Sequence, residues 1–492
     1  MTSIGLSELW LSVLLSLLAA PPVGVTLPDQ PPPDPAAEAA RFEAVSSQLD
    51  QGGIVHAYLS VDGDLTAIAG FVKSFMDEMR KIEPDVPPVN VPALLRVTGL
   101  DAVSAIGFSS VRTEHGFRNK TYLHSPEGRK GLLLLLGKKS TPFESLTLAP
   151  AGSDFVIEQD LNLKTLYESI VEGAGVQMGE QGKAMVQMAL KQPLPPPIPF
   201  TMEKVMADLD TKLTAIIDAD RTKMVNIPGA PKELKMPQLS GAVLIDGLGW
   251  IANELIKVLE TMLAHPTERP LFAKIVRNPN WVGVQLAIEP EQYSVMDAEI
   301  LELFGSTNPV LVHHLPSGKL VLASGLEFAD KLFAPKPGLG QDPAFLKTMK
   351  DLPMEGTALT YASPVLFSSL RQFSEKANQL SNDKEHEQDD RLIVSTLINL
   401  LLPQNAQGEG RVTTSTKDGM LTIANSAHSH KTSFFKGLAS PFFTIGMFTV
   451  PRMRGVGRQE FHAEDLEPHF HEHHNENPRR VPNGRDFEKT GD

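Results

Sequence analysis

The sequence predicts an α+β protein with two related lobes, each a mainly antiparallel sheet with helices packed against it. Three observations support this prediction. Short apolar strands are repeatedly followed by a turn and a helix, hairpin signals lie between these units, and a proline-rich segment at 192–199 interrupts the chain. The length of 492 residues, two to three times that of a typical domain, agrees with two domains or one duplicated domain.

The recurring strand–turn–helix unit is the main structural signal. In the first unit, residues 56–64 form the strand and turn, and apolar residues then recur at three- and four-residue spacing from Leu65 to Ile82. Asp64 is the expected N-cap of this helix, and Pro364 suits the first turn of another. The other strand–helix pairs are 154–160 with 163–171, 242–247 with 250–262, 357–363 with 364–373, and a shorter pair, 320–324 with 328–332.

Two hairpins are predicted between these units. Ala105–Thr113 and Phe117–Ser125 flank the turn at His115-Gly116, and Arg411–Thr416 and Met420–Ala424 flank a turn that contains Asp418-Gly419. Hairpins exclude a purely parallel sheet. The units are also too irregularly spaced for a solenoid, which would repeat every 20 to 50 residues or so. Duplication of a larger lobe therefore fits the spacing better.

Composition divides the chain into a folded body with atypical ends. Prolines from 193 to 199 cannot continue a helix, so we place the boundary between the lobes there. The predicted parts are an apolar leader at 1–26, a Pro-rich linker at 27–50, a first α+β lobe at 51–191, a linker at 192–199, a second α+β lobe at 200–430, an apolar segment at 431–450 and a disordered His-rich tail at 451–492.

The apolar run Leu9–Ala20 has the length of a signal-peptide core and is short for a membrane span. It predicts export to the periplasm or cell envelope. No Lys or Arg precedes it, and Pro21 stands where cleavage is expected. An uncleaved anchor, a misassigned start and an ordinary apolar helix therefore remain open alternatives.

Charge and cysteine content exclude several classes of function. A net charge of −14, from 45 Lys and Arg against 59 Asp and Glu, argues against a nucleic-acid partner. The chain has no cysteine, which excludes disulfides, thiolate catalysis, iron–sulfur clusters and a lipid-modified N-terminal cysteine.

The sharpest motif is Gly247-Leu248-Gly249-Trp250-Ile251-Ala252, a G-x-G-x-x-A between a predicted strand and helix. Such glycines let the backbone approach a dinucleotide pyrophosphate. The following segment, however, passes through Pro266 and Pro270 rather than forming a compact βαβ unit, and Asp246 adds a negative charge beside the supposed phosphate site. We interpret the motif as a strand-to-helix turn.

Acidic residues gather at predicted strand ends: Asp62, Asp64, Asp218, Asp220 and Asp246. They could converge as a general acid and base or as a calcium site. Helix caps and turns also need aspartate at such positions, and this structural interpretation is preferred. No EF-hand loop, Walker loop or Gly-x-Ser-x-Gly elbow is present in the sequence.

Histidines concentrate in His469–His474, with His462 nearby, and could chelate a transition metal. Without a scaffold such a cluster selects no geometry, so an incidental polar tail is the preferred interpretation. His313-His314 lies in an apolar stretch typical of core or edge histidines. We assign no catalytic, cofactor-binding or metal-binding residue and expect no cofactor.

The apolar segment 437–450 precedes Arg452 and Arg454 and contains Pro441. It is too short to span a bilayer, so a docked or interfacial segment is expected, with a true span as the alternative. This segment is the basis for a possible peripheral membrane association.

Three segments, Leu95–Val103, Ser125–Leu132 and Asp246–Trp250, resemble a group of large exported bacterial proteins known only as domains of unknown function. The resemblance covers roughly Gln51 to Ser426. It implies an envelope location and an α+β fold, and it supplies no catalytic residue.

Two functional hypotheses follow. The preferred one is a non-enzymatic envelope protein that binds a partner, a polymer or an apolar ligand on its sheets. The alternative is a hydrolase that uses carboxylates such as Asp62, Asp218 and Asp246.

Overall fold

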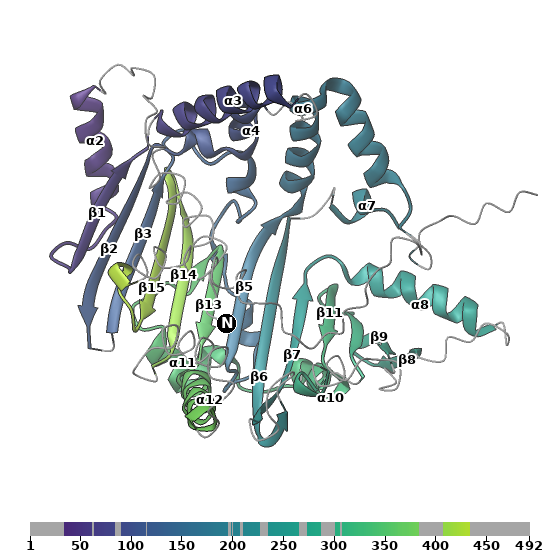
Figure 1. Cartoon of the computed structure of the whole chain (residues 1–492). Helices are drawn as coiled ribbons and strands as arrows, with labels where there is room; N and C mark the ends of the chain where they lie inside the picture. Colours follow the sequence, from purple (N-terminus) through teal and green to yellow (C-terminus); the bar gives the residue numbers. More distant parts are fainter. Residues whose placement is uncertain are drawn as a thin grey trace, which may run out of the picture. The chain divides into compact units, whose positions relative to one another are not determined.

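A computed structural model describes the part of the chain that carries the predicted units (Figure 1). The described residues are 34–61, 63–83, 90–114, 116–194, 198, 200–206, 210–226, 235–264, 273–286, 301–305, 308–382 and 407–432. The leader at 1–26, the apolar segment at 437–450 and the histidines of the tail lie outside them, as do Asp62 and His115.

One large antiparallel sheet organises the described residues. Its strand order is β1-β2-β3-β15-β14-β13-β5-β6-β7-β11-β10-β9-β8, so β1 and β8 are its edges. Strands β4 (Thr141–Pro142) and β12 (Glu355–Gly356) form a separate pair. The bounds of the large-sheet strands are β1 Val55–Ser60, β2 Ala105–Thr113, β3 Gly116–His124, β5 Phe155–Asn162, β6 Asp210–Asn226, β7 Lys235–Ile245, β8 Ala273–Asn278, β9 Trp281–Leu286, β10 Val310–His314, β11 Lys319–Ala323, β13 Ala358–Ala362, β14 Glu409–Thr416 and β15 Gly419–Ser426.

Helices connect the strands and cover both faces of the sheet. The α-helices are α2 Pro35–Ser46, α3 Asp64–Ile82, α4 Val91–Thr98, α5 Ser145–Leu148, α6 Leu163–Lys191, α7 Met202–Met206, α8 Gly249–Ala264, α10 Leu326–Phe333, α11 Pro343–Thr348 and α12 Pro364–Asn382. Short 3₁₀ turns are η1 Leu100–Ala102, η2 Gly131–Leu134 and η4 Leu339–Gln341. Gly179, with φ of +67°, breaks α6 into two helical arms.

The α+β fold class and the recurring units are confirmed. Each predicted strand runs into its predicted helix: β1 into α3, β5 into α6, β7 into α8, β11 into α10 and β13 into α12. Both hairpins are present as β2–β3 and β14–β15. Pro364 begins α12 as expected, because its fixed φ and missing N–H suit the first turn of a helix.

The boundary at 192–199 lies within the connection between two strands of one sheet. Strand β5 precedes this boundary and pairs with β6, which follows it. Strand β5 also pairs with β13, and β15 pairs with β3, so C-terminal strands lie between N-terminal ones. The large sheet therefore continues across both predicted lobes, and their duplication stays a prediction.

Two local predictions differ from the structure. Residues 35–46, expected within the Pro-rich linker, form α2, because Asp34 caps the helix and Pro35 suits its first turn. Val45 then packs against the sheet beside Tyr122. The N-cap of α3 is Gly63, with φ of +79°, and Asp64 is the first helical residue. A left-handed backbone favours glycine over aspartate at this position.

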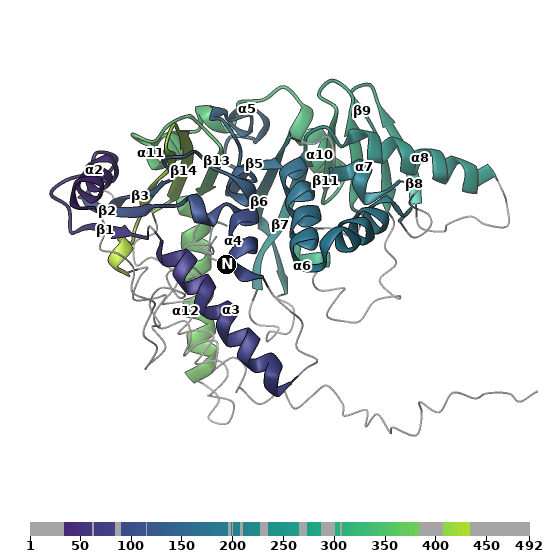
Figure 2. The same cartoon turned by 90° about the horizontal axis from the view of Figure 1, so that it is seen from above.

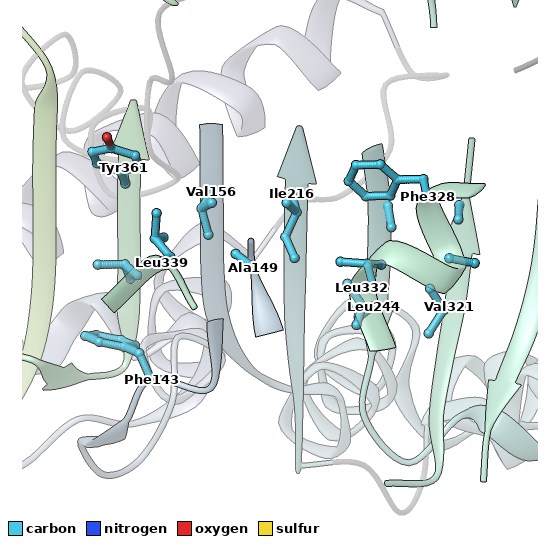
Figure 3. Packing of buried hydrophobic residues seen from close by; sticks show 14 of the residues in the cluster. Phe143, Ala149, Val156, Ile216, Leu244, Val321, Phe328, Leu332, Leu339 and Tyr361 are labelled. Carbon is cyan, nitrogen blue, oxygen red and sulfur yellow. The ribbon is translucent and has the colours of Figure 1, made fainter. Parts of the chain in front are cut away.

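The main core lies on the face of the sheet that contacts α10, here called the α10 face (Figure 3). Alternate residues of the central strands supply it, including Val156, Ile216, Leu244 and Val321. Val156 pairs with Ile216 across β5 and β6, and Leu244 pairs with Val321 across β7 and β11. Residues of α5, η4, α10 and α11 pack in the same cluster. Phe328 and Leu332 of α10 complete the contact, and all of these side chains are buried.

The opposite face, here called the α8 face, carries Ile157, Ala215, Val243 and Leu322 on the same strands. Helices α3 and α4 cover its β2–β3 end, and α8 packs over β10 and β11. Figure 2 shows α3, α4, α6 and α12 on one side of the sheet and α2, α5, α10 and α11 on the other. In Figure 1, no labelled helix crosses the middle of β5, β6 and β7.

Candidate functional site

The predicted acid Asp246 directly follows β7 and belongs to a charged cluster on the α10 face. Lys319, only 4% exposed, forms ion pairs with both Asp246 and Glu144. Its ammonium lies 2.7 Å from Glu144 Oε2. Burial alone would lower the pKa of Lys319, but its hydrogen bonds to Asp246 and Glu144 outweigh burial and raise that pKa. Lys319 therefore remains an ammonium ion that ties the loop before α5 to the sheet.

Glu158 lies on the same face and is satisfied by several donors. Its carboxylate accepts hydrogen bonds from the backbone N–H groups of Glu144, at 3.1 Å, and Ser145, at 2.7 Å. The ammonium of Lys212 lies 3.1 Å from Glu158 Oε1 and 3.9 Å from Asp160. Glu158 is only 1% exposed, and hydrogen-bond donors surround its buried carboxylate. We therefore assign Glu158 a structural role.

Asp218 belongs to a second charged cluster, at the other end of the same strands. Its Oδ2 lies 2.5 Å from the ammonium of Lys331, while its buried Oδ1 has no hydrogen-bond partner among the described residues. Nearby, Asp154 accepts hydrogen bonds from Arg221, at 2.6 Å, and from the Ser363 hydroxyl, at 2.7 Å. Each acid is thus held by a basic side chain.

Lys336 follows α10 next to this second cluster. Burial and the neighbouring charge of Lys331 lower the pKa of Lys336 to about 8. Its ammonium donates hydrogen bonds to the carbonyl oxygens of Lys331, at 2.5 Å, and Leu332. These contacts close the last turn of α10, where unpaired carbonyl groups favour a cation.

The structure does not bring the predicted acids together. Asp218 lies opposite Ser240 on β7, and Asp246 comes six residues later along that strand. At about 3.4 Å per residue, the two positions are separated by about 20 Å. Asp220 bonds within its own turn to Thr222, and Asp64 lies in the first turn of α3. The remaining predicted acid, Asp62, lies outside the described residues.

The glycine motif forms a tight turn between β7 and α8. Gly247 has φ of +72°, and a Cβ at Gly249 would lie 2.2 Å from His313 and 2.7 Å from the carbonyl oxygen of Gly318. Both neighbours of β7 are antiparallel to it, whereas a dinucleotide fold places this motif in a parallel βαβ unit. The two glycines have local structural roles in chain reversal and close packing.

The adjacent histidines His313 and His314 lie on β10, between β11 and β9. The His314 ring stacks on Phe333 at 3.9 Å between centroids, and its Nδ1 lies 2.6 Å from the Ser317 hydroxyl. Burial lowers the pKa of His313, which favours a neutral ring. Within the described parts of the chain, no group of three or more His, Asp or Glu residues could hold a metal ion.

A different feature emerges on the α8 face, where one line of paired residues crosses several strands. Arg411, Thr360, Ile157, Ala215, Val243 and Leu322 are successive register partners on β14, β13, β5, β6, β7 and β11. We call this set the register row. Leu311 and Val284 extend it onto β10 and β9.

The register row is apolar and incompletely covered. Leu322 is 50% exposed and Val243 is 36% exposed, while Ile157 and Ala215 are half-buried. Strand residues on the α10 face next to them are buried. Phe155 and Ile217 form a further half-buried apolar pair beside the row. The row contains no acidic residue, and its one charge is Arg411 at the polar end.

Sequence analysis did not identify the register row. The only local signal was that Ala242–Ile245 and Leu320–Ala323 are apolar on both strand faces, which normally indicates burial on both sides. Which residues share a row depends on pairing between distant strands.

Comparisons with known proteins found no relative of this chain. No protein-family model, curated protein or solved structure matches it. None of the helices described here is long and apolar enough to cross a membrane.

Proposed function

We propose that this protein is a non-enzymatic binding protein of the cell envelope that holds an amphipathic ligand with one long acyl chain and an anionic head on the register row. The incomplete cover over the apolar register row carries this proposal. The acidic residues that a hydrolase would need are instead paired with lysine or arginine in two separate clusters.

The dimensions of the row suit an acyl chain. Neighbouring strands lie about 4.8 Å apart, so Ile157 to Leu322 spans about 14 Å and Ile157 to Leu311 about 19 Å. One leaflet of a bilayer has a hydrocarbon depth of about 15 Å, half of the whole core. A chain of membrane-lipid length therefore reaches from β5 to Leu322 on β11, the last exposed residue of the row before α8 covers Leu311.

Polarity along the row sets the orientation of the ligand. From Ile157, the row continues through Thr360 on β13 to Arg411 on β14. Beside it, the hydroxyl of Thr413 on β14 lies 2.9 Å from that of Thr422 on β15. A carboxylate or phosphate head fits the hydrogen-bonding, cationic end, because guanidinium groups bind both anions well. The acyl chain then lies over Ala215, Val243 and Leu322, where it buries apolar surface.

The direct test is calorimetric titration of the delipidated full-length protein, with palmitate as the probe. We expect one palmitate per chain, and weaker binding of octanoate because fewer methylene groups are buried. Hexadecanol keeps the acyl length and lacks the anion, so it should bind about tenfold or more weakly than palmitate. A lysophosphatidate of the same chain length distinguishes a phosphate head from a carboxylate.

Two variants assign the ligand to the row. Leu322→Asn should weaken palmitate binding about tenfold, because it places an amide under the chain. Arg411→Gln should remove the preference for palmitate over hexadecanol. The matched control is Leu346→Asn on α11, where Leu346 is 46% exposed on the opposite face. Absence of palmitate binding, or equal losses in Leu322→Asn and Leu346→Asn, would overturn the proposal.

The envelope location is proposed from the sequence and has its own test. The apolar run Leu9–Ala20 and the Pro-rich segment after it support export. Mass spectrometry of the mature N-terminus, with cell fractionation, measures whether the leader is removed and where the protein accumulates. An intact N-terminus on protein recovered only from the cytosol contradicts this location without affecting the ligand proposal.

A further inference from the structure

The edge strand β1 has one side free of any described strand. It pairs with β2 over six residues, and it is the last strand in the order of the sheet. Figures 1 and 2 both place β1 at the outer margin of the sheet. The N–H of Val61 bonds to Ser104 at 3.0 Å, so by antiparallel alternation Leu59 and Ala57 also face β2. The main-chain groups of His56, Tyr58 and Ser60 therefore point outward.

The two edges of the sheet differ in charge. Strand β8, at the other edge, carries Lys274 and Arg277, and Arg277 forms an ion pair with Glu260 at 2.7 Å. Charged side chains, lysine above all, are the usual means by which proteins prevent an edge from pairing with another strand. Strand β1 reads Val-His-Ala-Tyr-Leu-Ser and has no lysine, arginine, acid or proline. It lacks the protection that β8 has.

Exposed apolar side chains flank β1. Ile54, immediately before the strand, is 49% exposed, and Phe42 of α2 is 47% exposed. The Phe42 ring packs edge-to-face on Tyr58, with centroids 5.3 Å apart. Tyr58 is itself fixed by a 2.7 Å hydrogen bond to Glu38. The edge thus combines outward main-chain groups with an ordered aromatic pair.

We propose that β1 pairs antiparallel with β1 of a second copy of this chain, forming a two-fold symmetric dimer in which the two sheets become continuous. Outward groups must pair with outward groups, and we place Tyr58 on the two-fold axis opposite its own copy, because this register brings the two aromatic pairs together. His56 then faces Ser60 of the other copy, and Ala57 faces Leu59. No like charges meet, so the strand is compatible with itself.

The symmetry also covers the exposed aromatic groups. The Tyr58 side chains of both copies meet near the axis on the face that carries α2, and each brings Phe42 beside it. An isologous contact closes after two copies and leaves no further β1 edge. Because two short strands bury little area, we expect a weak dimer with a micromolar dissociation constant.

Sedimentation velocity of the full-length protein over a range of micromolar concentrations measures this dimer. His56→Pro removes an outward N–H and leaves the β1–β2 hydrogen bonds in place. His56→Lys adds a positive charge to the edge strand, of the kind that β8 carries. Each should raise the dimer dissociation constant about tenfold or more, since both copies lose the contact. Leu346→Lys on α11 is the control and should leave the dissociation constant unchanged.

A cross-link reports the register independently of affinity. The chain has no cysteine, so Tyr58→Cys introduces a single thiol on the proposed axis. Hydrogen-bonded antiparallel partners have Cα atoms about 5.5 Å apart, within the range for a disulfide. We expect oxidation to yield a covalent dimer with Tyr58→Cys and none with Leu346→Cys. A monomer at all concentrations, or equal cross-linking of both variants, would overturn the proposal.

Discussion

The ammonium of Lys212 lies 3.1 Å from the carboxylate of Glu158, which is 1% exposed and also accepts two backbone hydrogen bonds. The pair joins adjacent strands β5 and β6 under the loop that precedes α5. Because Glu158 is buried, the loss of its counter-ion leaves a charge that water cannot reach.

Lys212→Met should therefore lower the free energy of unfolding by about 3 kcal/mol, as is typical when one member of a buried pair is removed. The double variant Glu158→Gln/Lys212→Met should recover part of this loss, because no buried charge remains. Urea unfolding measures both effects. Lys81→Met is the control: Lys81 and Glu78 are 70% and 68% exposed, so its effect should stay below about 0.5 kcal/mol.

Stability should fall in mild acid because of His430. Burial lowers the pKa of His430 to about 4, whereas the unfolded chain has a pKa near 6.5. The unfolded state therefore binds more protons between these values, and the free energy of unfolding decreases as pH falls below about 6.5. From pH 7.5 to pH 5, His430 should account for a loss of about 2 kcal/mol.

His430→Gln should reduce that pH dependence, since an amide can still donate to the carbonyl oxygen of Lys120, which lies 3.1 Å from His430 Nε2. His56→Gln, at an exposed position, provides the matched control. Urea unfolding at both pH values gives the comparison. Equal acid loss in wild type and His430→Gln would contradict this assignment.

Two glycine substitutions should have opposite effects. Gly249→Ala places a Cβ 2.7 Å from the Gly318 carbonyl oxygen and closer still to His313, so it should destabilise the protein by about 1 to 3 kcal/mol. Gly70→Ala, within α3, places a Cβ that meets no described atom within 4 Å beyond its chain neighbours and the backbone of its own helix, so it should stabilise the protein by up to about 1 kcal/mol. Thermal unfolding of the two variants tests the packing of the motif.

Asp342 should stabilise the protein by capping the N-terminus of α11. Its Oδ1 accepts from the N–H groups of Ala344, at 2.7 Å, and Phe345, at 3.0 Å, and its Oδ2 accepts from Gly152 at 2.8 Å. Asp342→Ala should cost about 1 to 2 kcal/mol of stability, and Asp342→Asn less, because an amide oxygen can still cap α11. Chemical denaturation of both variants separates capping from the loss of charge. Equal losses would contradict a capping role.

The elements themselves could be predicted because their signals are local. Apolar residues at helical spacing identified α3 and α8, and Asp418-Gly419 identified the hairpin of β14 and β15. Pro364 predicted the start of α12 for the same reason: its ring fixes one backbone angle at that residue. The N-cap of α3 was wrong because a left-handed turn at Gly63 outweighed the preference of Asp64.

Tertiary structure decided which of these elements became neighbours. Strand β5 lies between β13 and β6, and only this pairing puts Arg411, Ile157 and Leu322 in one row. The register of β6 against β7 places Asp218 opposite Ser240, six residues before Asp246, and so separates these two acids. Local periodicity determines whether a segment becomes a strand or a helix. Register between distant strands depends on the whole core, so it determines the register row, the charged clusters and the place of β1 at one edge of the described sheet.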